Sequence, residues 1–118
     1  MNPMEIKLYK AQIIRGKDDI AREWMRFLDA NKEEGARLLK NEQAYLEVYF
    51  SAVEDGTMFI YMFFAAKDIA GSNAIAKGSE NPTDKKHFEY ASRCVEPNKG
   101  DIMDCLFYME NLEDVGKY

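Results

Sequence analysis

The feature that most constrains the fold is a pair of β-rich segments, joined by a tight turn, between Ala44 and Ala66. Asp55-Gly56 lies between the two segments, and an Asp-Gly dipeptide favours a β-hairpin because glycine readily adopts the positive φ that the turn requires. The second segment, Met58–Phe64, carries apolar or aromatic residues throughout. A strand with one solvated face would alternate in polarity, so we expect this segment to be an interior strand covered on both faces.

The rest of the chain alternates between strand and helix patterns. Polarity alternates along the first segment, whereas apolar residues recur every three or four positions after Asp18, as on one face of a long helix. Thr83 or Asp84 is expected to cap the helix that follows Pro82. The predicted elements are a strand at Met4–Ile14, a helix at Asp18–Asn41, strands at Ala44–Val53 and Met58–Phe64, helices at Ile69–Ala76 and Thr83–Val95, and a strand at Ile102–Met109.

This βαββαβ order predicts an α+β fold of the split-βαβ, ferredoxin-like kind, in a single domain spanning residues 1–118. The expected antiparallel four-stranded sheet has the order 4-1-3-2, with the helices on one face. Strands three and four are apolar on both faces, so the face opposite the helices would expose a large apolar surface, which usually marks an interface. The simplest partner is a second copy, so we expect a homodimer in which two sheets enclose an α+β barrel.

Composition narrows the partners and the location. The net charge of −5 repels phosphate backbones and anionic lipids, so we expect neither nucleic acid nor a membrane as a partner. No signal peptide or spanning segment is evident, which predicts a cytoplasmic protein. Cys94 and Cys105 are expected to be reduced, buried thiols. Because no paired metal-ligand cluster or phosphate-binding loop occurs, we expect no metal and no cofactor.

Several motifs carry a resemblance to a known group of proteins: Arg15-Gly16-Lys17 with Ala21-Arg22-Glu23-Trp24-Met25, the hairpin with Glu47 and Tyr61, Lys67-Asp68-Ile69, and Asn81-Pro82-Thr83-Asp84 with His87. Across roughly positions 4 to 110 the chain resembles the dimeric α+β barrel superfamily, and within it a family of small bacterial proteins of unknown function. That superfamily includes antibiotic-biosynthesis monooxygenase-like proteins, stress-responsive barrel proteins and rhamnose mutarotases.

The chain departs from these relatives at two places. The family pattern has a histidine before the proline, where this sequence has Asn81, and only the later His87 is present. That departure argues against two-histidine chemistry, including a metal site. The tryptophan pair that likeness to the mutarotases would imply is replaced by Phe88-Glu89-Tyr90, so mutarotase activity is not favoured.

Two residues are candidates for catalysis. His87, the one histidine, could be a general acid or base or a haem ligand at a pocket, or simply a half-exposed helix residue. Glu47 lies between Tyr45 and Tyr49 on one face of its predicted strand. It could move a proton if that face lines a cavity, or it could be solvated at a sheet edge. Tyr45, Tyr49 and Tyr61 are the candidate ligand-binding residues, although Tyr61 could equally be part of the core.

The sequence supports a leading hypothesis and two alternatives. The first is a homodimer that binds a small apolar or aromatic molecule in the space between sheet and helices. The second is a cofactor-independent monooxygenase or mutarotase-like isomerase that uses His87 or Glu47 for proton transfer. The third is a structural module whose apolar face only pairs chains, which predicts a core without a cavity.

Overall fold

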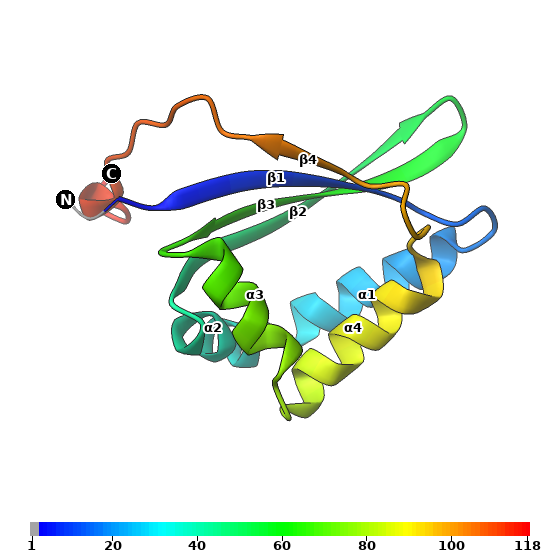
Figure 1. Cartoon of the computed structure of the whole chain (residues 1–118), viewed down its shortest axis with the longest axis horizontal. Helices are drawn as coiled ribbons and strands as arrows, with labels where there is room; N and C mark the ends of the chain where they lie inside the picture. Colours follow the sequence, from blue (N-terminus) through cyan, green and yellow to red (C-terminus); the bar gives the residue numbers. More distant parts are fainter. Residues whose placement is uncertain (1–2) are drawn as a thin grey trace.

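A four-stranded antiparallel sheet forms one layer of the protein, and four helices cover one of its faces (Figure 1). This architecture comes from a computed structural model, which describes residues 3–118. The elements are β1 (Glu5–Gln12), α1 (Asp18–Ala30), α2 (Lys32–Asn41), β2 (Ala44–Glu54), β3 (Thr57–Ala66), α3 (Ile69–Lys77), α4 (Pro82–Cys94), β4 (Asp101–Asp104) and the short 3-10 helix η1 (Leu112–Asp114).

The sheet has the order β2-β3-β1-β4 with antiparallel neighbours throughout, which confirms the predicted ferredoxin-like α+β topology. The hairpin turns at Asp55-Gly56, where both residues have positive φ, and β3 lies in the interior of the sheet between β2 and β1. The side chains of Ile60 and Phe64 on the helix face are almost fully buried. The doubly apolar hairpin strand therefore has the interior position that its sequence predicts.

The main core lies where α1 and α4 pack together against the sheet (Figure 1). Trp24 of α1 is only 5% exposed and belongs to this core. Cys94 closes the far end of α4, where the backbone N–H of Ile14 donates to its carbonyl oxygen at 2.8 Å. A second, smaller cluster around Phe64 and Ile69 joins α3 to the other end of the sheet. No helix within residues 3–118 is long and apolar enough to cross a membrane.

The long helix predicted from Asp18 to Asn41 is wrong, because the structure divides it into α1 and α2 at Asn31. Asn31 has a non-helical backbone, and its side-chain Nδ2 donates to the carbonyl oxygen of Phe27 at 2.8 Å, which satisfies one of the last carbonyls of α1. The bend therefore occurs at an asparagine and not at Gly35, although glycine has the lower helix propensity.

The last strand is shorter than predicted. β4 ends at Asp104 instead of Met109, and it pairs only with Lys7–Lys10 of β1. The segment that follows makes no further ladder with β1, so Leu106 is 97% exposed. Cys105 lies in this segment and is exposed, contrary to the expectation of two buried thiols, whereas Cys94 is buried and both are free.

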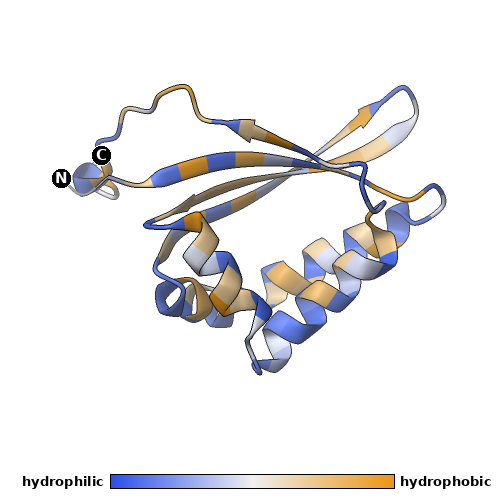
Figure 2. Cartoon of the chain, in the orientation of Figure 1, coloured by the Kyte–Doolittle hydropathy of each residue, from blue (hydrophilic) through white to orange (hydrophobic). Residues whose placement is uncertain are grey.

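The sheet face opposite the helices has no cover within the described chain. Figure 2 shows hydrophobic residues along the strands and along the segment after β4, whereas polar residues dominate much of the helix surface. The cross-strand register places Leu46, Phe50 and Met103 on this open face, all of them at least partly exposed. The expected apolar surface is therefore present.

Candidate functional site

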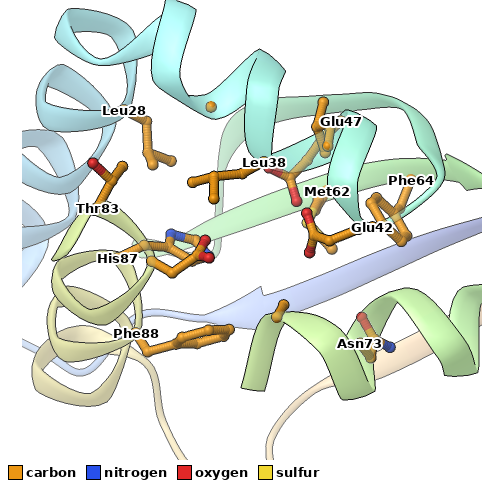
Figure 3. A pocket seen from close by; sticks show the side chains of 14 residues that line it. Leu28, Leu38, Glu42, Glu47, Met62, Phe64, Asn73, Thr83, His87 and Phe88 are labelled. Atoms are coloured by element: carbon orange, nitrogen blue, oxygen red, sulfur yellow. The ribbon is translucent and has the colours of Figure 1, made fainter. Parts of the chain in front are cut away.

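A cavity of about 140 Å³ lies between the helices and the helix-facing side of β2 and β3 (Figure 3). Apolar residues, among them leucine, methionine and phenylalanine, form the larger part of its wall, and ionisable side chains line it from three different parts of the chain. Its lining residues are Leu28, Gly35, Leu38, Leu39, Glu42, Glu47, Met62, Phe64, Asn73, Ala76, Thr83, Asp84, His87 and Phe88.

The hairpin register directs Glu47 into this cavity. Glu47 pairs with Phe64 and Tyr49 pairs with Met62, so their side chains lie on the face that the helices cover. Figure 3 shows the carboxylates of Glu47, from β2, and of Glu42, at the end of α2, pointing into the same space. The edge strand therefore supplies an acid to a partly enclosed site, and Glu47 lies on the helix-covered face of the sheet.

The start of α4 supplies the opposite wall. Asn81 is the N-cap, its Oδ1 accepting from the backbone N–H of Thr83 at 2.8 Å, and Pro82 occupies the first helical turn. Thr83 and Asp84, the predicted caps, are instead part of the helix. Asp84 and His87 are three residues apart on one helix face, so both line the cavity.

Trp24 fixes the orientation of His87. The indole Nε1–H donates to His87 Nδ1 at 2.9 Å, and the two rings lie 5.5 Å apart. The ring of Tyr49 is 5.9 Å from that of Trp24 and 6.4 Å from that of His87, edge-on to both. Burial lowers the pKa of His87, although the nearby charge of Asp84 opposes this shift. His87 is therefore a neutral, oriented imidazole at neutral pH.

Both glutamates titrate near neutrality. The pKa of Glu47 is raised to about 7, mainly by burial and then by the charge of Asp84, with hydrogen bonding to Tyr49 acting in the opposite direction. Burial and the charges of Asp84 and Glu47 also raise the pKa of Glu42 to about 7. The pKa of Tyr49 lies well above its usual value, because of burial and the neighbouring glutamates. The cavity thus holds two carboxyls that can donate or accept a proton near pH 7.

A more open groove of about 590 Å³ adjoins the cavity along β2. Leu28, Gly35 and Glu47 line both spaces, so Glu47 can be approached from either one. A Cβ atom added at Gly35 would meet no heavy atom within 4 Å. A larger side chain at this position of α2 would therefore grow into the space between the helix and the sheet.

The structure brings together His87, Glu47 and Tyr49 but separates the other two tyrosines from them. Tyr45 lies at a register irregularity between Ala44 and Leu46 and is 51% exposed, beside a shallow depression at the end of α2. Tyr61 pairs with Phe50, on the open face of the sheet.

Tyr61 belongs to a different cluster on that open face. It donates from its hydroxyl to Glu54 Oε2, and Lys10 Nζ donates to Glu54 Oε1 at 3.1 Å. These contacts are made on the side of the sheet away from the cavity.

Sequence reasoning missed three members of the site. Glu42 follows α2 without any recognisable motif, Asp84 stands out in the sequence only as a possible helix cap and as part of the Asn81-Pro82-Thr83-Asp84 motif, and Trp24 only as part of a motif of the first helix. The distance of 63 positions between Trp24 and His87 hides their hydrogen bond from any local pattern. Within residues 3–118, no group of three or more His, Cys, Asp or Glu side chains is arranged to hold a metal ion.

The fold and this site define a ferredoxin-like α+β protein with an enclosed cavity on the helix side of its sheet. The sequence profile of a family of unknown function, DUF6176, matches residues 4–113. The chain belongs to that family. No curated protein matches it at a significant level.

Solved structures resemble the chain in fold. An uncharacterised NIPSNAP-like domain protein from Burkholderia xenovorans aligns with a TM-score of 0.60 and 12% identity, over 94% of this chain and 92% of that one. A dimeric protein of unknown function and ferredoxin-like fold from Bacteroides fragilis aligns at 0.59 and 11%, over 88% and 96%. A protein from Nitrosomonas europaea named "Putative antibiotic biosynthesis monooxygenase" aligns at 0.54 and 16%, over 93% and 97%.

Proposed function

We propose that the protein binds a small molecule with an apolar or aromatic body in the cavity between the sheet and the helices. The observation that carries this proposal is the lining of the cavity: mostly apolar walls with Glu42, Glu47, Asp84 and His87 projecting into them. Carboxyls with pKa values raised to about 7 are costly to the fold at neutral pH. The presence of such carboxyls in a mostly apolar cavity is typical of a ligand site.

We also propose that the active form is a homodimer closed across the open sheet face. Phe50 is 56% exposed and Met103 is 38% exposed on that face, and Phe107 in the segment after β4 is 73% exposed. Exposed apolar side chains on the sheet face and in this segment favour a protein partner. The similar proteins from Bacteroides fragilis and from an uncultured marine organism are described as dimeric, which supports a second copy of this chain as that partner.

A second candidate function is proton transfer on the bound molecule. Glu47 and His87 line the same cavity from opposite walls, and a carboxyl with a pKa of about 7 suits a general base. Glu47 would take a proton from one carbon and return it to another position, which requires no redox partner and gives an isomerase. The similarity to proteins named monooxygenase extends to the fold only and specifies no chemistry. A carboxyl and an imidazole on one cavity suit proton transfer, which supports isomerisation.

Native mass spectrometry of the purified full chain tests the proposal, because one spectrum reports both assembly and retained ligand. We expect a dimer with additional small-molecule mass that is lost on denaturation. A monomer would contradict the proposed interface. A dimer without added mass, together with unchanged Trp24 fluorescence on addition of aromatic ketones, would contradict the binding function.

A further inference from the structure

We propose that Trp24 is a positioning residue that makes His87 a hydrogen-bond donor, and that the cavity is therefore specific for neutral ligands with a carbonyl oxygen. This inference rests on the proposed binding function and deepens it by naming the chemical class of the ligand and the residue that sets it.

The first step concerns which nitrogen of His87 carries the proton. An indole Nε1–H can only donate, so the nitrogen that it contacts at 2.9 Å, His87 Nδ1, must accept. A neutral imidazole carries one N–H, and with Nδ1 unprotonated that N–H is on Nε2. Trp24 thus selects the tautomer of His87.

The second step concerns where this Nε2–H is available. Within residues 3–118 the bond from Trp24 is the one hydrogen bond that the His87 side chain makes, and no buried side-chain nitrogen or oxygen lacks a partner. Nε2 therefore retains accessible surface, and the ring lines the cavity. A ligand that reaches Nε2 from the cavity would meet a donor, so it would bind best when it presents an acceptor.

The packing around Trp24 favours one orientation of the His87 ring. Trp24 is 5% exposed in the main core, where α1 packs against α4. The centroid of the His87 ring lies 5.5 Å from that of Trp24 and 5.0 Å from that of Phe88. Rotation of the imidazole would break the partly buried hydrogen bond with Trp24, which favours the observed orientation of the ring.

The third step concerns the charge of the acceptor. Glu42, Glu47 and Asp84 line the cavity around His87, from the end of α2, from β2 and from α4. Within residues 3–118, no Lys or Arg side chain lines this cavity. A carboxylate or phosphate would be repelled, whereas an uncharged carbonyl oxygen would not. The apolar walls suit the remainder of such a molecule.

A carbonyl ligand also connects His87 with the proton-transfer candidate. With its oxygen on His87 Nε2–H, the C–H bonds next to the carbonyl become more acidic. The Glu47 carboxylate would accept the proton as the electron pair of the C–H bond forms the C=C bond of an enolate and the carbonyl π pair moves onto the oxygen, where Nε2–H stabilises the negative charge. In a ligand whose enolate extends over a neighbouring C=C bond, return of the proton from Glu47 to the far carbon of that system re-forms the carbonyl, restores the carboxylate and gives the isomer.

The tautomer can be measured directly, because the chain contains one tryptophan and one histidine. In ¹⁵N-labelled full-length protein at pH 7.5, a long-range ¹H–¹⁵N spectrum distinguishes the protonated from the unprotonated ring nitrogen. We expect a protonated Nε2, an unprotonated Nδ1, and a coupling between Nδ1 and the Trp24 indole nitrogen across the hydrogen bond. A protonated Nδ1 would overturn the inference.

The variant Trp24→Phe tests whether the indole N–H, and not only the packing of an aromatic ring, sets the tautomer of His87. It keeps an aromatic ring but removes the donor, so we expect the His87 signals to become an average of both tautomers. Phe27→Leu is the matched control, since it alters the same core and leaves the indole in place. An unchanged tautomer in Trp24→Phe, or an equal change in both variants, would overturn the role of Trp24. Should Trp24→Phe fail to fold, the wild-type tautomer remains the deciding measurement.

Three probes test the ligand class: acetophenone, α-methylstyrene, which replaces the carbonyl by C=CH₂, and benzoate. Titrations followed at the His87 ring signals, which the wild type and Trp24→Phe both have, should show at least about fivefold tighter binding of acetophenone than of α-methylstyrene, the effect of one hydrogen bond, and the weakest binding for benzoate. Trp24→Phe should remove this preference without weakening α-methylstyrene. Equal affinities in the wild type would overturn the inference alone. Absence of binding by all three would overturn the proposed function, and the ligand class with it, while the tautomer result stands.

Discussion

Replacing Glu47 by glutamine should raise the free energy of unfolding of the protein at alkaline pH. The pKa of Glu47 rises from 4.5 to about 7 on folding, a difference of about 2.5 pKa units. At about 1.4 kcal/mol per unit, the ionised carboxylate costs the folded state roughly 3 kcal/mol.

The sign follows from which state holds the proton. Between pH 4.5 and 7 the folded protein binds the Glu47 proton more tightly than the unfolded chain does. This stabilising contribution is complete below pH 4.5 and is lost as the pH rises through 7. Glutamine does not titrate, so Glu47→Gln should have nearly wild-type stability at pH 4.5 and exceed it by up to roughly 3 kcal/mol at pH 8.5.

Urea unfolding of both full-length proteins at pH 4.5 and pH 8.5 measures this difference. The protein concentration must be equal in all samples, because a dimer unfolds at a concentration-dependent midpoint. Glu33→Gln is a suitable control, since Glu33 is exposed on α2 away from the cavity. The reasoning would be refuted if the effect of Glu47→Gln were the same at both pH values, or if the variant were less stable than the wild type at pH 8.5.

Three further substitutions test the cavity, the cap and the open face. Gly35→Leu should weaken acetophenone binding at least tenfold in a titration, because the leucine side chain would occupy part of the cavity. The same substitution should stabilise α2 by up to about 1 kcal/mol. An unchanged affinity for acetophenone would count against this site. Asn81→Ala should lower the free energy of unfolding by about 1 kcal/mol through loss of the α4 cap; equal urea midpoints would contradict that role. Phe50→Glu places a charge on the open face and should give a monomer in sedimentation equilibrium; an intact dimer would show that the interface lies elsewhere.

The topology was predictable because it depends on local signals that agree with one another. Asp55-Gly56 fixes the hairpin, and the apolar run after it can only be stable in the interior of a sheet. The same turn also fixes the register: Glu54 pairs with Thr57, so Tyr61 must pair with Phe50. Tyr61 and Glu47 therefore lie on opposite faces, and this consequence could have been derived from the sequence by counting from the turn.

The break between α1 and α2 was harder to predict. Gly35 has the lower helix propensity, but Asn31 ends the helix because its side chain competes for a backbone carbonyl. The length of β4 was not predictable from its own sequence. Alternation in the sequence continues to Met109, whereas pairing with β1 ends at Lys7 and Asp104 although β1 itself begins at Glu5. The pattern of one segment does not reveal how far a neighbouring strand pairs with it.

The candidate site was predictable only in part. Glu47 and His87 stood out as isolated ionisable residues, and the structure places both on one cavity. The contribution of Trp24 depends on a contact between the two helices α1 and α4, and that of Glu42 depends on how α2 turns after Asn31. Both arise from helix packing, which periodicity alone does not specify.

The most direct test of the central claim is a titration of the wild type and of Gly35→Leu with acetophenone, followed at the single Trp24 indole signal. We expect a saturable shift in the wild type, because the probe binds beside His87, which Trp24 contacts. In Gly35→Leu, where the leucine side chain fills the cavity, we expect no shift or an affinity at least tenfold weaker. Equal titration curves for the two proteins, or no shift in the wild type, would contradict the claim that this cavity is the binding site.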